Sequence, residues 1–256
     1  MKSQSIARAV LEHFKFLVED IPTAAHEGLQ EADFKATFAG VTLLMEEKIK
    51  EEAPSAVARR QATHAQGAVH VETLPFWRDT TVSGVVRKAS QQLRSSSRHP
   101  HDFRFIWFTA TGATAIGKYE QFRATMYGHT NILEFGSNDC RPCYFFRHSD
   151  FFKRSDVIDG AIAAYTSGSS VVAKVCLNPH SQRYAALRRS PVLYPFGTEI
   201  EDPLELEAHG KALVLDTDLD RRDKGPLLEY LQRKYSTGPL MTIDLGYTRA
   251  SVSLDR

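Results

Sequence analysis

The sequence predicts a mixed α/β fold in which a mixed β-sheet is flanked by helices. Helical stripes and β-leaning runs alternate along the chain, which favours this class over all-α or all-β folds. Of the 256 residues, 42% are hydrophobic and 25% are charged, the balance of a water-soluble globular protein. This composition excludes disordered, collagen-like and membrane-spanning chains, and the length suits one large domain or two modest ones.

The N-terminal elements can be taken in order. Apolar residues at three- and four-residue spacing predict a helix over residues 6–18. Two β-leaning runs, 33–38 and 41–45, flank Ala39-Gly40 and predict a tight hairpin, because glycine supplies the positive φ that the turn needs. Residues 50–79 show no sustained period and indicate an insertion that is partly loop. A helical stripe over residues 81–93 and an apolar run over 103–108 then predict a helix followed by a buried strand.

The second half of the chain continues in mixed fashion. Helices are predicted over residues 115–127, 156–165, 182–188 and 226–235, and strands over 131–135, 143–146, 171–177 and 212–215, before a final β segment. The acidic run 199–207, broken by Pro203, predicts a surface connection. We therefore expect a core of residues 1–112, with the insertion inside it, and an α/β extension of residues 113–256 that either joins the same domain or forms another layer.

Charge and cysteine content limit the partners and the compartment. The 32 Lys and Arg residues nearly balance the 31 Asp and Glu residues, so any phosphate-binding surface must be a local patch. The N-terminal stretch is interrupted by Glu12 and Lys15, which is atypical of a signal peptide, and no long uncharged apolar run predicts a membrane span. Three cysteines argue against a disulfide framework. These features predict a cytoplasmic protein with no membrane partner.

The predicted hairpin carries the candidate chemistry. Its register places Asp33 opposite Glu46, and like charges opposed across a ladder are unfavourable unless a cation lies between them. Side chains alternate along a strand, so Glu46 and Lys48 share one face and Glu47 points to the other. Two carboxylates and an amine suit Mg²⁺ or Mn²⁺, which complete their coordination with water and substrate phosphate. This arrangement predicts phosphodiester hydrolysis.

These residues resemble the signature of the PD-(D/E)XK nuclease superfamily, whose fold is restriction-endonuclease-like. The signature is an acidic residue entering one strand, a hairpin, and acidic-x-Lys on the next strand. Here it reads Ala32-Asp33 and Glu46-Glu47-Lys48, with Ala32 where the family has proline. The family fold runs helix, β-meander, helix and strand, and the elements predicted for residues 1–112 follow that order. The resemblance implies that Asp33 and Glu46 bind Mg²⁺ or Mn²⁺ and that Lys48 assists the attacking water.

The resemblance also implies further site residues and a setting. Members of this fold draw polar residues from the flanking helices, and the matching candidates are Glu12 or Glu19 from the first and Gln92 from the second. The implied function is a Mg²⁺-dependent nuclease that cuts DNA, with RNA as the alternative. By analogy it would serve a restriction or phage-defence system, with a partner protein or as a homo-oligomer. The competing hypotheses are a non-catalytic binding or assembly module and a merely solvated hairpin end.

Other patterns predict weaker sites. Four residues have spacing tolerable for structural zinc, although small thiols beside apolar strands are usually just buried: Cys140, Cys143, Cys176 and His180. Two basic groups are candidates for phosphate contact, the first comprising Arg87, Lys88, Arg94 and Arg98 and the second Arg183, Arg188 and Arg189. Asp216, Asp218 and Asp220 are interpreted as a polar loop, because neither the glycine nor the glutamate of a calcium loop follows.

Overall fold

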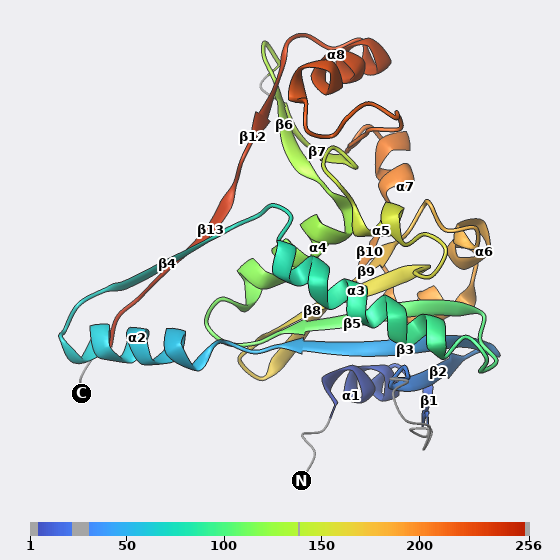
Figure 1. The fold of residues 1–256 in the computed structure, drawn as a ribbon. Helices are drawn as coiled ribbons and strands as arrows, with labels where there is room; N and C mark the ends of the chain where they lie inside the picture. Colours follow the sequence, from blue (N-terminus) through green and yellow to red (C-terminus); the bar gives the residue numbers. More distant parts are fainter. Residues whose placement is uncertain (1–4, 22–30, 138, 254–256) are drawn as a thin grey trace.

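A seven-stranded mixed sheet forms the centre of the computed structural model, which describes residues 5–21, 31–137 and 139–253 (Figure 1). In spatial order its strands are β1 (Leu17–Asp20), β2 (Phe34–Phe38), β3 (Val41–Lys50), β5 (Phe103–Ala110), β8 (Gly160–Ser167), β9 (Ser170–Leu177) and β10 (Ile200–Glu201). Strands β1 to β3 form an antiparallel meander, whereas β3, β5 and β8 run parallel. The sheet therefore takes strands from both halves of the chain, and the predicted mixed α/β class is confirmed.

The β2–β3 hairpin has the predicted register. Phe34 pairs with Met45 and Phe38 with Val41. The turn residues Ala39 and Gly40 have φ values of 48° and 79°, the left-handed conformation that a two-residue hairpin turn requires. Strand β3 is longer than the sequence pattern suggested, because it also pairs with β5 as far as Lys50.

Helices cover both faces of this sheet (Figure 1). Helices α3 (Thr80–Ser95) and α4 (Ala115–Tyr127) pack on one face, with Val86, Ala89 and Phe122 fully buried. Helix α1 (Ile6–His13), helix α6 (Tyr184–Arg188) and the 3₁₀ helix η1 (Pro191–Phe196) pack on the other. The sheet is thus a buried middle layer, and no helix in the described part of the chain is long and apolar enough to cross a bilayer.

A smaller four-stranded sheet lies at one end of the molecule, at the top of Figure 1. Its strands are, in spatial order, β11 (Leu213–Val214), β7 (Cys140–Tyr144), β6 (Thr130–Glu134) and β12 (Leu240–Ile243). Helix α8 (Lys224–Tyr235) packs Leu227 and Leu231 against it. The second half of the chain also contains two short helices, α5 (Asp150–Lys153) and α7 (Pro203–Ala208).

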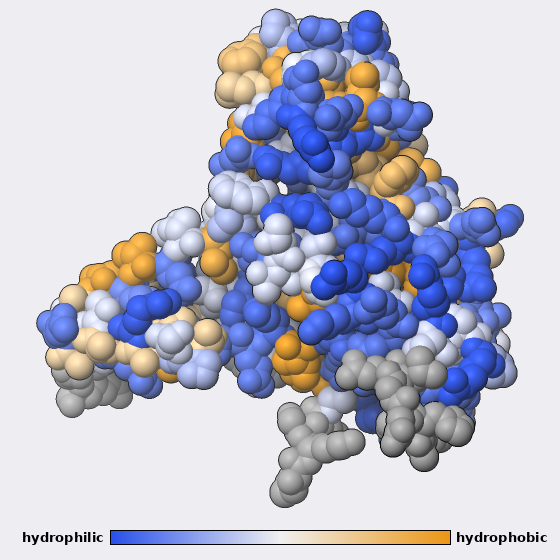
Figure 2. Space-filling view, viewed as in Figure 1, coloured by the Kyte–Doolittle hydropathy of each residue, from blue (hydrophilic) through white to orange (hydrophobic). Residues whose placement is uncertain are grey.

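The predicted insertion contains α2 (Pro54–Ala65) and β4 (His70–Pro75), and together with β13 (Gly246–Ser251) from the end of the chain these elements form what we call the arm. Strands β4 and β13 make a two-stranded antiparallel ribbon at the left of Figure 1. Helix α2 contains no buried residue, so it has no apolar stripe by which the sequence pattern could reveal it. Val69 and Val71 are more than half exposed, and orange atoms mark the arm in Figure 2.

One predicted helix is too long, and another is mostly a strand. The helix expected over residues 6–18 ends at His13, Lys15 adopts a φ of 68°, and Leu17 begins strand β1. The helix expected over residues 156–165 is instead largely strand β8. This strand is covered on both faces, so small residues replace the alternating pattern, and a Cβ at Gly160 would lie 2.5 Å from the Phe105 ring.

The acidic run 199–207 is also not the surface connection that we expected. Glu201 and Asp202 are buried, in β10 and at the start of α7. The Glu201 carboxylate accepts hydrogen bonds from Arg123 Nε at 2.8 Å and Nη2 at 2.9 Å, and from the Tyr144 hydroxyl at 2.7 Å. These contacts hold the pKa of Glu201 at about 2 despite its burial. This ion pair joins the large sheet, α4 and the small sheet.

Candidate active site

The hairpin register brings Asp33 and Glu46 to the same level of the sheet. Asp33 comes directly before β2, and its amide donates to the Met45 carbonyl at 3.1 Å. The Asp33 carboxylate in turn accepts the Glu47 amide at 2.7 Å, which fixes it beside β3. The carboxyl groups of Asp33 and Glu46 are close enough to interact directly. The structure therefore brings the two predicted carboxylates together.

Glu46 is the most unusual carboxyl group of the site. Its side chain is completely buried, and its Oε2 atom has no hydrogen-bond partner in the described part of the chain. Burial raises its pKa to about 8, and the nearby charge of Asp33 adds to that effect, whereas Lys48 opposes it. A buried oxygen without a partner is costly, so this atom is poised to gain one.

Lys48 and Gln92 complete the predicted group. The Lys48 ammonium contacts Glu46 Oε1 and donates to Gln92 Oε1 at 3.0 Å. Gln92 lies on α3, and its amide nitrogen donates to the Glu31 carbonyl at 3.3 Å. The lysine is thus held by one residue from its own strand and one from the covering helix. Gln92, predicted from its place on the later helix, does lie at this site.

Glu47 points to the opposite face, as strand alternation requires. Its Oε1 atom accepts the Ala7 amide at 3.0 Å, and its Oε2 atom accepts the Ser5 hydroxyl. A carboxylate at a helix N-terminus satisfies amides that have no partner within the helix. Glu47 therefore holds the start of α1 and is not part of the carboxylate pair.

Sequence reasoning missed Glu31, a buried carboxylate that precedes the hairpin. Its Oε1 atom pairs with Arg98 and lies 3.7 Å from His99 Nε2, and its Oε2 atom has no partner in the described residues. The sequence did contain a hint of this residue, since Glu31 lies two residues before Asp33, and side chains two apart in an extended chain point to the same side. Two acidic residues were predicted from the first helix instead. Glu12 does lie in α1, where it pairs with Arg8.

That other candidate, Glu19, lies in β1 and pairs with Lys35 at 3.0 Å. Both candidates are therefore engaged in surface ion pairs.

The two basic groups predicted to contact phosphate are also partly engaged in ion pairs. Arg94 pairs with Asp156 at 2.6 Å and Arg183 with Asp159 at 3.3 Å.

The remaining members of the basic groups divide in the same way. Arg98 and Arg188 are in ion pairs, whereas Arg87, Lys88 and Arg189 are exposed. Figure 2 shows a largely hydrophilic surface over the face that carries α3. The positive charges of Arg87 and Lys88 on α3 are therefore solvated.

The alternative zinc site receives no support from the geometry. Cys143 is buried in the small sheet, Cys176 is buried in the large sheet, and Cys140 is exposed. Burial raises the pKa of both buried thiols. The His180 ring packs edge-on against Phe145, with 4.4 Å between ring centroids. The buried thiols thus act as small apolar groups.

The described residues contain no cluster of three or more metal-ligating side chains, so the carboxylate pair is the donor set to consider for a divalent ion. Mg²⁺ is commonly held by one or two carboxylates and completes its octahedron with water and phosphate oxygens. Asp33 and Glu46 supply two hard oxygen donors, and the partnerless Oε2 atom of Glu46 supplies a buried lone pair. The donor chemistry suits Mg²⁺ or Mn²⁺.

Comparison of the chain with family models, with curated proteins and with solved structures finds no significant match.

Proposed function

We propose that this protein is a metal-dependent nuclease that hydrolyses phosphodiester bonds of DNA. The observation that carries the proposal is the buried Glu46 carboxyl group, with a partnerless oxygen and a raised pKa, beside Asp33 and Lys48. Perturbed carboxyl groups that converge with a cation are typical of functional sites rather than of solvated strand ends. Most buried side-chain oxygens in proteins have a hydrogen-bond partner, so the free Oε2 atom of Glu46 favours a ligand at this position.

The chain's residues have separate roles in this proposal. Asp33 and Glu46 would hold the ion, and the Glu46 carboxyl group would release its proton to solvent as the ion bound. Bound Mg²⁺ or Mn²⁺ lowers the pKa of a coordinated water and offsets charge on the phosphoryl group. Lys48 places its ammonium beside this pair, where it orients the attacking water or offsets developing negative charge. Gln92 is a positioning residue, since it contacts Lys48.

The order of elements supports the resemblance to PD-(D/E)XK nucleases. Helix α1, the β1–β3 meander, helix α3 and strand β5 come in this order, with α2 and β4 inserted between β3 and α3, and β5 lies parallel to β3. Asp33 precedes β2, and Glu46 and Lys48 lie on β3, which supports the proposal. DNA is the favoured substrate and RNA the alternative. A restriction or phage-defence setting, with a partner protein or a second copy, follows from analogy alone.

The test is a cleavage assay on plasmid, linear duplex and single-stranded DNA and on RNA, with Mg²⁺, Mn²⁺ or EDTA. Wild type is expected to cut in either metal and not in EDTA. Glu46→Gln and Lys48→Ala should lose cleavage while retaining cooperative melting, and Gln92→Ala should lower kcat. Glu51→Gln is the matched control, because Glu51 is an exposed carboxylate just after the same strand.

The competing hypothesis, a non-catalytic binding module, predicts a different result. Wild type would then bind nucleic acid without cutting it under any metal condition, including in the presence of proteins encoded beside it. Equal cleavage by wild type and Glu46→Gln would point to a contaminating nuclease and would refute the proposed site.

A further inference from the structure

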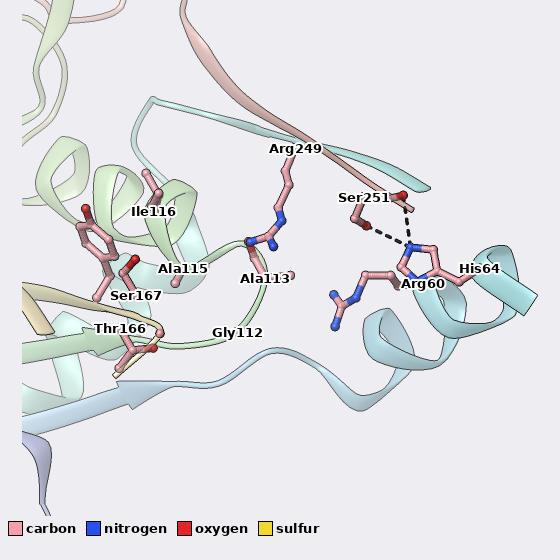
Figure 3. A pocket seen from close by; sticks show the side chains of 12 residues that line it. Arg60, His64, Gly112, Ala113, Ala115, Ile116, Thr166, Ser167, Arg249 and Ser251 are labelled. Carbon is pink, nitrogen blue, oxygen red and sulfur yellow. Dashed lines mark hydrogen bonds between the residues drawn. The ribbon is translucent and has the colours of Figure 1, made fainter. Parts of the chain in front are cut away.

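A cavity of about 590 Å³ lies between the arm and the central sheet, outside the candidate active site. Its lining comes from α2, from the loop that leads from β5 into α4, from the β8–β9 turn and from β13 (Figure 3). It opens beyond the carboxyl ends of the parallel strands β5 and β8. In open α/β sheets, crevices at this end of the strands are the usual places for ligands.

Two arginines from distant parts of the chain line this cavity, Arg60 from α2 and Arg249 from β13 (Figure 3). The Arg60 guanidinium pairs with Glu52, which is largely buried. Arg249 is exposed, and its Nη1 atom donates to the Ala113 carbonyl at 2.6 Å. A guanidinium has five N–H donors, and this bond occupies one of them. Arginine forks match phosphate oxygens.

The wall of the cavity is built rather than incidental. His64 Nε2 lies 3.1 Å from the Ser251 hydroxyl and so ties β13 to α2. The Glu52 carboxylate accepts the Ala113 amide at 3.2 Å, opposite the Arg249 contact. Gly112 has a φ of +88°, and a Cβ there would lie 2.7 Å from the Glu52 Cβ. Glycine is therefore needed for the loop to pass this close.

The described residues that line the cavity include two arginines and no acidic side chain. Two carboxylates lie outside this lining: Glu52 pairs with Arg60, and Glu72 stands opposite Arg249 in the β4–β13 ladder. Burial lowers the pKa of Lys118, and the neighbouring Lys50 adds to that effect. Because these cations repel one another, an anion in the cavity would be favourable. The first turn of α4, which also borders the cavity, contains no acidic side chain.

The cavity continues the face that carries the carboxylate pair. Glu46, Lys48 and Lys50 alternate along β3 and so point to the same side, the side covered by α3 and α4. Lys48 pairs with Phe108 in the β3–β5 register, and the cavity begins four residues later at Gly112. At about 3.3 Å per residue this spans at most roughly 13 Å, which places the cavity within a few nucleotides of the carboxylate pair along a bound strand.

We infer that this cavity binds a backbone phosphate of the same nucleic acid that the carboxylate pair cleaves, with Arg60 and Arg249 as its ligands. The inference rests on the proposed function and extends it, because it assigns the arm a role in holding the substrate a few nucleotides from the cleaved bond. The volume admits a phosphate with its sugar. Arg249 and the N–H groups of Arg60 that Glu52 does not use would hold the phosphate without reading the base.

The test measures binding of a labelled duplex and of the corresponding single strand by fluorescence anisotropy, without Mg²⁺ so that the probe stays intact. Arg249→Ala is expected to weaken binding about 10-fold, the loss of one charged hydrogen bond. It should also reduce the slope of log K against log salt by about 1. Arg249→Lys should restore the slope. Arg233→Ala, at an exposed arginine on α8 beside the small sheet, is the matched control and should change neither quantity.

The outcomes separate this inference from the proposed function. If wild type cleaves DNA and Arg249→Ala matches it in affinity and salt slope, the cavity does not bind phosphate and the nuclease proposal stands. If wild type neither binds nor cleaves any nucleic acid, both fail. A melting shift with inorganic phosphate that Arg249→Ala abolishes, with DNA binding unchanged, would make this a small-anion site and overturn the inference. Arg60→Lys serves as the second variant, since it keeps a cation beside Glu52.

Discussion

Replacing Glu46 by glutamine should stabilise the metal-free protein, although it removes the proposed metal ligand. Glu46 is fully buried, and its pKa is raised to about 8 chiefly by that burial and further by Asp33. In the unfolded chain the same group titrates near 4.5. Between these two pH values the folded protein holds a proton that the unfolded chain has released. The free energy of unfolding therefore falls as pH rises through this window.

The size of the effect follows from the two pKa values. One proton gives a slope of at most about 1.4 kcal/mol per pH unit, so the stability lost between pH 4.5 and 8 is on the order of 5 kcal/mol. This is large beside the roughly 5–15 kcal/mol that holds a typical domain together. Glu46→Gln keeps the shape and removes the titration. The unfolding free energy of Glu46→Gln should equal that of wild type near pH 4.5 and exceed it by several kcal/mol above pH 8.

Urea unfolding in EDTA across this pH range tests the prediction. The quantity of interest is the difference in unfolding free energy between Glu46→Gln and wild type, because other titrating groups cancel in it. Glu51→Gln, at an exposed position, should give a difference that does not vary with pH. A flat difference curve for Glu46→Gln would refute the reasoning, since it would mean that Glu46 is ionised without penalty in the folded protein.

Three further predictions concern the metal, the buried ion pair and one glycine. Mn²⁺ at a hundred times its Kd should add about 2.7 kcal/mol and raise the Tm by about 5–10 °C, and Asp33→Asn should abolish this shift in a thermal melt. Arg123→Met should cost about 3–5 kcal/mol in urea unfolding, because it leaves the buried Glu201 charge unpaired, and a loss under 1 kcal/mol would contradict that role. Gly112→Ala should cost about 1–3 kcal/mol, more than Gly136→Ala, because both have positive φ but only Gly112 lacks space for a Cβ.

The hairpin and its register could be predicted because the signals are local. Ala39-Gly40 fixes a two-residue turn, and a two-residue turn fixes which residues oppose each other. Alternation along β3 then separates Glu46 and Lys48 from Glu47 without any knowledge of the rest of the fold. Gln92 followed from the helical stripe of α3 and its place after the meander.

Other elements could not be predicted, because distant segments decide them. Strand β8 resembles a helix in sequence, since burial between β5 and β9 with helices on both faces allows small residues throughout. The acidic residue Glu201 reads as surface until Arg123 and Tyr144 meet it from other elements. Glu31 reads as an ordinary charge before the hairpin until it is buried beside Arg98.

The sequence by itself determined the mixed α/β class, the hairpin register and the face on which Asp33, Glu46 and Lys48 lie, because turn chemistry and strand alternation act over a few residues. Only the tertiary structure decided how deeply Glu46 is buried, since that depends on α3 and on the strands around it. It also decided that Arg60 and Arg249 line one cavity. Residues so far apart in the chain meet only because β13 pairs with β4, and no local pattern records a long-range pairing.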